Sequence, residues 1–259
     1  MAVTNDNFIT VSGVSKRFTS DEGVLTALSD ISFTVGRGET VCIVGASGCG
    51  KSTLLRAIAG LDPDHDGTVT IDGTEILQPS KHIGIVFQEP RLFPWLTVRR
   101  NSRFPLSGIP KKQKVETANK YIRLVGLTGF EKTFPSHLSG GMAQRAGIAR
   151  ALVNNPPVLL LDEPFGALDA FTKIAMQNEL KRIQQEFGTT MILVTHDIDE
   201  AVYLADRVIV FSSRPGRIRQ IIPVDLPEPR DRNSYEFLEV RRSIFSRFFS
   251  PEEHRPDAD

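Results

Sequence analysis

The sequence has few cysteines, no excess of one charge and no long hydrophobic run. Its 259 residues include only two cysteines, Cys42 in an apolar segment and Cys49 in a glycine-rich loop. Their placement favours neither a disulfide framework nor a metal site, and it predicts a reducing compartment. Lys plus Arg and Asp plus Glu both number 31, so the formal net charge is zero. This balance argues against a dedicated nucleic-acid-binding protein, which typically carries a basic excess.

The hydrophobic runs are also too short to form a membrane-spanning helix. The longest, such as 158–161 and 208–211, have the length of a strand, whereas a bilayer requires roughly 18–20 consecutive apolar residues. The N-terminal MAVTNDNFITV lacks the basic leader and apolar block of a secretory signal. With 40% hydrophobic residues, the chain still has enough apolar material for a packed core. We therefore expect a folded cytoplasmic protein, unless a partner holds it elsewhere.

Short apolar segments alternate with helical ones along much of the chain. We expect buried strands at 40–44, 83–87, 158–161 and 191–194, and helices at 51–59 and 170–186. This alternation is typical of an α/β fold with a mainly parallel sheet. Near the N-terminus, segments 8–18 and 27–35 instead alternate apolar and polar residues, which predicts half-buried antiparallel strands. Segment 68–71, flanked by two Asp-Gly pairs, has the pattern of a hairpin.

The pattern changes to helical spacing, with several prolines, between residues 97 and 155. We interpret 97–155 as a helical subdomain inserted into a core formed by 1–96 and 156–225. The remaining 226–259 is a polar, proline-rich tail that contains a short amphipathic helix at 235–249.

One glycine-rich loop matches a phosphate-binding motif. GASGCGKST fits G-x-x-x-x-G-K-[ST] and lies between an expected strand and an expected helix, which is the context that the motif requires. Its backbone N–H groups and the helix N-terminus favour phosphates. Lys51 is expected to reach the β- and γ-phosphates, and the Ser52 hydroxyl to bind Mg²⁺. The nucleotide-binding residues predicted here are Gly45, Ala46, Ser47, Gly48, Cys49, Gly50, Lys51, Ser52 and Thr53.

Two acidic residues follow the apolar segment 158–161. Asp162 at the strand end is expected to lie beside the metal, directly or through a water. Glu163, one residue further, is expected to orient or deprotonate the water that attacks the γ-phosphate.

Two further polar residues follow other expected strands. Ligands of open α/β sheets gather at the carboxyl ends of the strands. His196 follows segment 191–194 there, which makes it a candidate contact to the γ-phosphate. Gln88 follows segment 83–87 at the same edge, where it could sense Mg²⁺ or the attacking water.

Taken together, the sequence motifs resemble those of the ATP-binding cassette (ABC) subunits. GASGCGKST, the glutamine of VFQEP, LSGGMAQR, LLLDEP, GALD and the histidine of VTHD occur in the order of that family, from about residue 8 to about residue 222. The resemblance implies a P-loop NTPase (RecA-like) core with an N-terminal antiparallel β subdomain and a helical insertion. It also implies that Phe18 stacks on adenine.

A second segment, HLSGGMAQR, has the pattern of an anion-binding site but lies far from the P-loop in the sequence. The resemblance implies a role for it. In ABC proteins two nucleotide-bound subunits pair head-to-tail, and the LSGG loop of one closes over the ATP of the other. Ser139, Gly140 and Gly141 are therefore expected to contact the ATP of a partner chain in a homodimer. Asp169 of GALD is expected among the nucleotide-binding residues.

Two other segments resemble one branch of this family. RLFPWLTV and SSRPGRI are similar to subunits of importers for nitrate, aliphatic sulfonates and taurine. The resemblance implies two integral-membrane permease subunits, an extracytoplasmic solute-binding protein that acts indirectly, and a peripheral location on the cytoplasmic face of the cell membrane. Related importers continue with a glutamate, an asparagine and an apolar residue where RRNS stands at 99–102. This segment is expected to face the permease, although it could be a solvated face.

Several alternatives are less consistent with the sequence. The basic residues Arg99, Arg100 and Arg103 lack the interleaved aromatics of a nucleic-acid-binding surface, so no nucleic-acid partner is expected. A chromosome-maintenance ATPase carries long heptad insertions, which this sequence does not show. A ribosome-associated ABC factor carries two cassettes, whereas this sequence has the motifs of one. A small P-loop kinase or GTPase leaves LSGG and VTHD unexplained. An importer of another small solute stays open.

Overall fold

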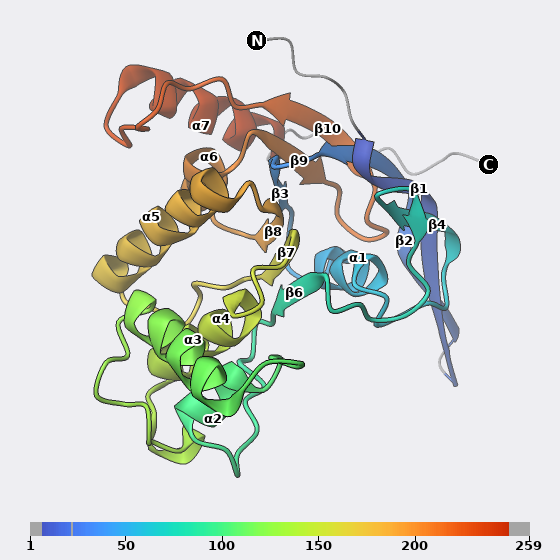
Figure 1. Cartoon of the computed structure of the whole chain (residues 1–259). Helices are drawn as coiled ribbons and strands as arrows, with labels where there is room; N and C mark the ends of the chain where they lie inside the picture. Colours follow the sequence, from blue (N-terminus) through green and yellow to red (C-terminus); the bar gives the residue numbers. More distant parts are fainter. Residues whose placement is uncertain (1–6, 22, 249–259) are drawn as a thin grey trace, which may run out of the picture.

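The computed structural model describes residues 7–21 and 23–248, which form two β-sheets, with most of the helices on one side of the larger sheet (Figure 1). The strands are β1 (Asn7–Ser20), β2 (Gly23–Gly36), β3 (Thr40–Val44), β4 (Asp66–Ile71), β5 (Thr74–Glu75), β6 (Ile83–Val86), β7 (Val158–Asp162), β8 (Thr190–Thr195), β9 (Arg207–Phe211) and β10 (Ile218–Pro223). The helices are α1 (Lys51–Ile58), α2 (Val98–Arg103), α3 (Lys111–Leu124), α4 (Gly140–Leu152), α5 (Ala170–Phe187), α6 (Ile198–Leu204) and α7 (Tyr235–Phe248), with a 3-10 turn η1 (Pro135–His137).

The larger sheet has six strands in the order β10-β9-β3-β8-β7-β6. Its pairs are parallel except for β10, which lies antiparallel to β9. All residues of β3, β7 and β8 are buried, as continuous apolar runs become when both faces of a parallel sheet are covered. The predicted mainly parallel α/β core is thereby confirmed. Because parallel strands end at one edge, the segments after β3, β6, β7, β8 and β9 meet there.

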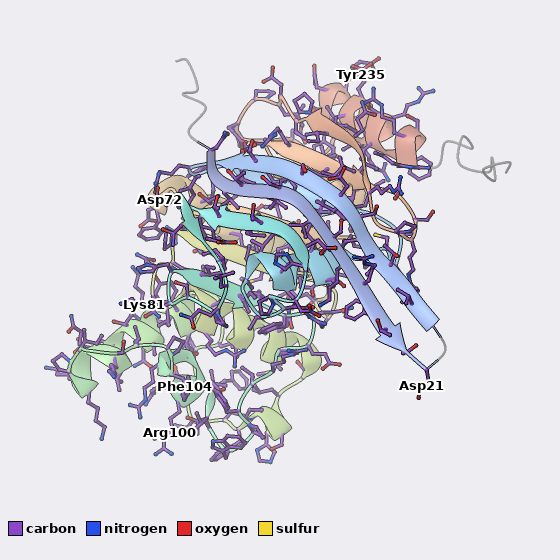
Figure 2. All side chains as sticks on the ribbon, turned by 90° about the vertical axis from the view of Figure 1, so that its right-hand side faces the viewer. Asp21, Asp72, Lys81, Arg100, Phe104 and Tyr235 are labelled. Carbon is purple, nitrogen blue, oxygen red and sulfur yellow. The ribbon has the colours of Figure 1, made fainter. Side chains whose placement is uncertain are left out.

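The smaller sheet is antiparallel, in the order β2-β1-β4-β5. Its long hairpin β1–β2 extends away from the body of the molecule, with Asp21 at the tip (Figure 2). The turn between β4 and β5 uses Asp72 and Gly73 at φ values of 52° and 71°, the positive values that favour an Asp-Gly pair in a two-residue hairpin turn. The expected antiparallel strands and hairpin are therefore confirmed, although the first two strands are longer than predicted.

Two hydrophobic cores share the larger sheet. Successive residues of a strand point to opposite faces, so Cys42 and Val44 of β3 join the core under α4, α5 and α6. Val41 and Ile43 join the second core, which also contains residues of α1, β1 and β2. The sheet is thus held between the antiparallel sheet with α1 on one side and the other helices on the opposite side.

The chain between β6 and β7 forms α2, α3, η1 and α4 at one end of the molecule (Figure 1). Asn101 lies fully buried in this part, where its Oδ1 accepts from Phe93 N at 2.8 Å and its Nδ2 donates to Leu96 O at 2.8 Å. Ser102 is also fully buried. Only Arg99 and Arg100 of segment 99–102 can therefore contribute to a surface. The subdomain boundaries after residues 96, 155 and 225 stay a prediction.

The C-terminal part contains three elements to which the sequence pattern assigned no structure, α6, β9 and β10. The expected helix at 235–249 is present as α7 up to Phe248, and residue 249 lies outside the described residues. Helix α7 packs Phe237 and Ile244 into the core. None of the helices in 7–21 and 23–248 combines the length and apolarity that crossing a membrane requires.

Candidate functional site

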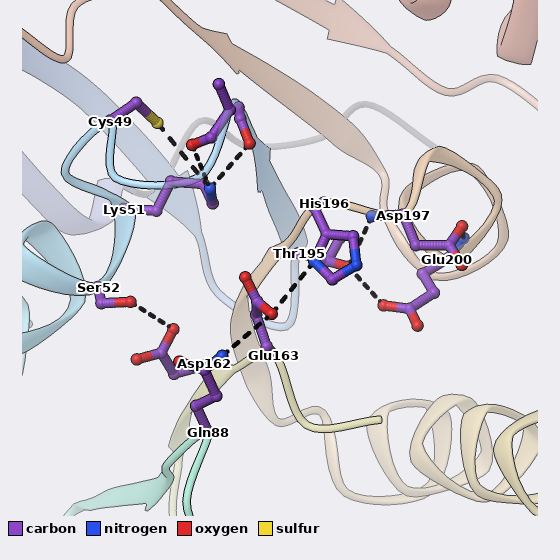
Figure 3. A network of polar contacts seen from close by, with 12 residues as sticks. Cys49, Lys51, Ser52, Gln88, Asp162, Glu163, Thr195, His196, Asp197 and Glu200 are labelled. Carbon is purple, nitrogen blue, oxygen red and sulfur yellow. Dashed lines mark hydrogen bonds and ion pairs between the residues drawn. The ribbon is translucent and has the colours of Figure 1, made fainter. Parts of the chain in front are cut away.

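The loop between β3 and α1 is folded around the ammonium group of Lys51. This group is almost fully buried and donates to Gly45 O at 2.8 Å and to Ala46 O at 2.9 Å (Figure 3). Gly50 has a φ of 102°, and a Cβ there would lie 2.7 Å from Ala27 O. Only glycine fits that combination of backbone angle and close approach. Because the carbonyls turn toward the lysine, backbone N–H groups are left for an anion.

A pocket of about 270 Å³ lies beside this loop. The β1–β2 hairpin contributes the Phe18 ring, which is 42% exposed. The loop side is lined by Lys51 and Ser52, and Glu163 lies at the sheet edge. The full lining is Phe18, Leu25, Ala27, Ser47, Gly48, Gly50, Lys51, Ser52, Thr53, Gln88, Glu163 and Arg214. The structure thus brings the loop, the predicted adenine-stacking ring and two predicted catalytic residues to one pocket.

Ser52, which lines this pocket, contacts the acidic side chain of Asp162. Ser52 Oγ donates a hydrogen bond of 2.8 Å to Asp162 Oδ1. Burial raises the pKa of Asp162, and the Ser52 hydrogen bond only partly opposes this effect. A buried carboxylate of this kind is suited to a cation, and a hydroxyl with one carboxylate is a donor set that Mg²⁺ uses together with phosphate oxygens. The residues present therefore fit Mg²⁺.

Glu163 connects the ends of three strands. It follows β7 with a positive φ of 44°, and its N–H donates to Val194 O of β8 at 2.9 Å. Its Oε2 accepts from Gln88 Nε2 at 3.4 Å and lies 3.1 Å from His196 Nδ1. Figure 3 shows this carboxylate between Asp162 and His196. The predicted convergence of Gln88, Glu163 and His196 at the carboxyl ends of the strands is therefore present in the structure.

A buried polar network holds the segment that carries His196. Thr195 Oγ1 donates to Glu200 Oε2 at 2.6 Å and accepts from Asp197 N at 3.0 Å. Lys173 Nζ of α5 lies 2.7 Å from Asp197 Oδ2 and 2.6 Å from Glu200 Oε1. Sequence reasoning did not identify this network, because Lys173 comes from a different helix.

The two carboxyl groups of this network have pKa values shifted in opposite directions. Burial raises the pKa of Glu200, although Lys173 and Thr195 act against it. Burial also acts to raise the pKa of Asp197, but Lys173 and the N–H groups at the start of α6 outweigh that effect and lower it. A cation shared by two carboxylates thus fixes the loop that positions His196.

The LSGG segment lies outside the pocket of its own chain, at the start of α4. Ser139 is exposed and caps α4, with its Oγ accepting from Met142 N at 3.3 Å. Gly141 packs so closely on segment 166–169 that a Cβ would lie 3.0 Å from Ala167 O. Asp169 caps α5 through Thr172 N at 3.0 Å. Hydrogen bonds from the Thr172 hydroxyl and N–H lower the pKa of Asp169. Ser139, Gly140, Gly141 and Asp169 are not among the residues that line the pocket of the same chain.

Sequence reasoning missed three residues of the pocket. Leu25 and Ala27 belong to β2, and Arg214 belongs to the turn after β9. Arg214 could have been found by the argument that identified His196, because β9 ends at the same sheet edge as β3. A strand assignment for 207–211 was needed first.

Together these groups can perform hydrolysis of a phosphoanhydride. The loop provides a cradle for phosphates, the Ser52–Asp162 pair provides oxygen ligands for a cation, and the Glu163 carboxylate can accept a proton from water. His196 and Gln88 both contact the Oε2 atom of this carboxylate.

Comparison with known proteins agrees with this geometry. The sequence family described as ABC transporter matches residues 28–166. The aliphatic sulfonates import ATP-binding protein SsuB of a Bacillus cereus strain is 49% identical over 240 residues, covering 93% of this chain and 95% of that protein. The protein of the same name from Bacillus subtilis (strain 168) is 47% identical over 247 residues, covering 95% and 96%.

A solved structure shares the same fold. A dimeric ATP-binding cassette in a post-hydrolysis state, bound to ADP and Pi, matches with a TM-score of 0.78 at 32% identity and covers 85% of this chain and 100% of that chain. The family match spans more than half of the chain, and the relatives are about half identical over most of it. The predicted resemblance and the predicted P-loop NTPase fold with its antiparallel and parallel sheets are both confirmed. The chain belongs to the ABC transporter family and is one of its nucleotide-binding subunits.

Proposed function

We propose that the chain hydrolyses ATP to ADP and phosphate in the pocket beside Lys51, and that this reaction energises a membrane importer. The observation that carries the proposal is the meeting of the P-loop, the Ser52–Asp162 pair and the Glu163–His196 pair at one sheet edge. ATP would place its phosphates on the N–H groups of residues 45–53 and its adenine on Phe18. Lys51 neutralises the β- and γ-phosphates after leaving its loop carbonyls.

In this proposal Glu163 is the general base. Its Oε2 is held by Gln88 and His196, which leaves Oε1 to accept the proton of a water beside the γ-phosphate. His196 also contacts the γ-phosphate, and Gln88 orients the water. The Lys173 network keeps His196 in place through Thr195 and Asp197.

Mg²⁺ would be held by Ser52 and Asp162, with Gln88 beside them, and would supply positive charge next to the phosphates. The burial of Asp162 supports this assignment, because an ionised carboxylate away from water is stabilised by a bound cation.

The LSGG segment completes the site of a second copy. Ser139, Gly140 and Gly141 are outside the pocket of their own chain, and Ser139 is exposed at the N-terminus of α4. A helix N-terminus favours a phosphate. We therefore assign Ser139, Gly140, Gly141 and Asp169 to the ATP held by a partner subunit, in a head-to-tail homodimer that closes when ATP binds. The matching cassette is itself dimeric.

The importer is of the small-anion type, with aliphatic sulfonates as the first candidate class of solute. Relatives that are 47–49% identical carry the name of aliphatic sulfonate import ATP-binding proteins. By this likeness the chain pairs with two integral-membrane permease subunits on the cytoplasmic face of the cell membrane, and a solute-binding protein acts on the other side.

The permease would contact the surface beside α2. A cavity of about 580 Å³ there is lined by Trp95, Arg100, Arg103 and Phe104, among others. Trp95 and Phe104 are 68% and 60% exposed, and Figure 2 shows Arg100 and Phe104 at the end of the molecule opposite Tyr235. Arg99 contributes less to this surface than its sequence position suggests, because its Nε already donates to Asn119 Oδ1 at 2.9 Å.

Purification of the tagged chain from detergent-solubilised membranes tests this function. We expect two permease subunits to be recovered, identified by mass spectrometry, together with ATP hydrolysis that Lys51→Ala abolishes. Uptake of labelled ethanesulfonate, taurine and nitrate by cells with and without the chain then identifies the solute class. Recovery with ribosomes or DNA and no membrane protein contradicts the proposal.

A further inference from the structure

The turn after β9 is fixed against strand β2. Gly216 N donates to Ala27 O at 2.9 Å, and Ser29 N donates to Gly216 O at 3.0 Å. Within the turn, Ser212 Oγ donates to Pro215 O at 2.8 Å and accepts from Arg217 N at 3.0 Å. These bonds attach residues 212–217 to the part of β2 that lines the nucleotide pocket.

The same turn lies directly on the P-loop. A Cβ on Gly216 would lie 2.2 Å from Cys49 O, so no larger residue fits there. Arg214 donates to Gly48 O twice, from Nε at 3.1 Å and from Nη2 at 2.9 Å. Gly45, Ala46 and Gly48 therefore all direct their carbonyl oxygens to cationic side chains, the first two to Lys51 and the third to Arg214.

Within residues 7–21 and 23–248, no ion pair joins the guanidinium of Arg214 to a carboxylate. Among the described residues it forms hydrogen bonds only to the neutral Gly48 carbonyl, whereas Arg17, Arg37 and Arg207 each pair with an acidic side chain. Arg214 is exposed and lines the same pocket as Phe18 and Lys51. An arginine always stays protonated and has N–H groups beyond the two used here. Its free side is thus a donor for an anion in the pocket.

We propose that Arg214 is a nucleotide-binding residue, whose guanidinium is held in position by Gly48 O and donates to the phosphate chain of bound ATP. This inference rests on the proposed binding of ATP in this pocket. Its physical reason is that a charge-assisted hydrogen bond to phosphate is stronger than one to a neutral acceptor. The alternative is that Arg214 only fastens the turn to the P-loop.

Nucleotide binding by the full-length chain separates these two roles. Dissociation constants of ADP, AMP and adenosine are measured by calorimetry for the wild type and for Arg214→Met, Arg214→Lys and Arg217→Met. Arg217→Met is the matched control, because it removes the same charge from the same turn at a residue outside the pocket lining. The midpoint temperature of thermal unfolding of each nucleotide-free variant measures whether Arg214 stabilises the fold by holding the turn on the P-loop.

We expect Arg214→Met to weaken ADP binding by about tenfold and to leave adenosine binding unchanged, with Arg214→Lys between Arg214→Met and the wild type. Arg217→Met should bind all three ligands as the wild type does. Equal ADP affinity in Arg214→Met and the wild type overturns the proposal. So does an equal loss for ADP and adenosine accompanied by a lowered midpoint, which identifies a fastening role. A wild-type chain that does not bind ADP instead overturns the proposed function itself.

Discussion

His196 Nδ1 lies 3.1 Å from Glu163 Oε2, although the two residues follow different strands of the sheet. Gln88 Nε2 approaches the same oxygen at 3.4 Å. Two groups therefore occupy one oxygen of the carboxylate, and in the described part of the chain no hydrogen bond is recorded to the other. This asymmetry is the basis for assigning Glu163 as the residue that activates water.

Glu163→Gln is expected to keep ATP binding and to slow hydrolysis on the order of 10²-fold or more, because the amide cannot accept the proton. It is also expected to accumulate an ATP-bound dimer. Steady-state ATPase rates and size-exclusion chromatography with ATP measure both effects. Turnover near the wild-type rate in the purified variant removes Glu163 from this role.

Lys173→Met is expected to destabilise the fold by about 3 kcal/mol at neutral pH, because buried Glu200 and partly buried Asp197 lose their cation. Urea unfolding of the nucleotide-free chain measures this free energy. Adding Glu200→Gln to Lys173→Met should restore part of the loss, since one unpaired charge is removed. No recovery in the double variant argues that Lys173 acts through packing alone.

The cost of Lys173→Met should also depend on pH. Lys173 helps to lower the pKa of Asp197, so the stability from this pair is present above the unfolded pKa of about 4. It is lost as pH falls through the lower folded pKa. Without Lys173, the carboxylates of the variant take up protons at higher pH, and this neutralisation reduces the loss of stability that the substitution causes. The difference between wild type and variant should therefore shrink as pH falls from 7 toward 4, and a constant difference contradicts the ion-pair account.

Arg100→Glu is expected to weaken attachment to the permease while basal ATPase activity stays close to wild type. Arg100 is exposed beside Trp95 and Phe104, whereas its neighbours Asn101 and Ser102 are buried. The fraction of chain that sediments with permease-containing membranes measures attachment. Arg242→Glu, an equal charge change on α7, is the control. Unchanged sedimentation of Arg100→Glu excludes this surface.

The sequence was sufficient to predict the parallel core and most of the site. Segments such as 158–161 are continuous apolar runs, and the rule that the carboxyl ends of such strands meet at one edge correctly placed Gln88, Glu163 and His196 near one another. The P-loop motif fixed the position of β3 and α1, because it requires a strand before it and a helix after it.

Other features depend on contacts that are distant in sequence. Arg214 bonds to a loop 166 residues earlier, and nothing near it in the sequence specifies that partner. Helix α6 has only seven residues, too few for a clear helical period. Asn101 is a polar residue that typically lies on a surface, yet it is buried because backbone groups of 93–97 satisfy its amide.

In the proposed homodimer, the LSGG segment of one chain and the P-loop of the other form one ATP site. Chains carrying Lys51→Ala and chains carrying Ser139→Arg, both in a Glu163→Gln background, each lack every complete site when alone. If the site is shared, a mixed dimer contains one site with both lesions and one site with neither.

The most direct measurement is ATP occlusion after mixing the two variants, with cross-linking to count the mixed dimers. We expect one occluded ATP for each mixed dimer and none above background in either variant alone. Mixed dimers that form and occlude no more ATP than the separate samples contradict the shared site, and they leave each chain's P-loop and LSGG segment to act on the same ATP.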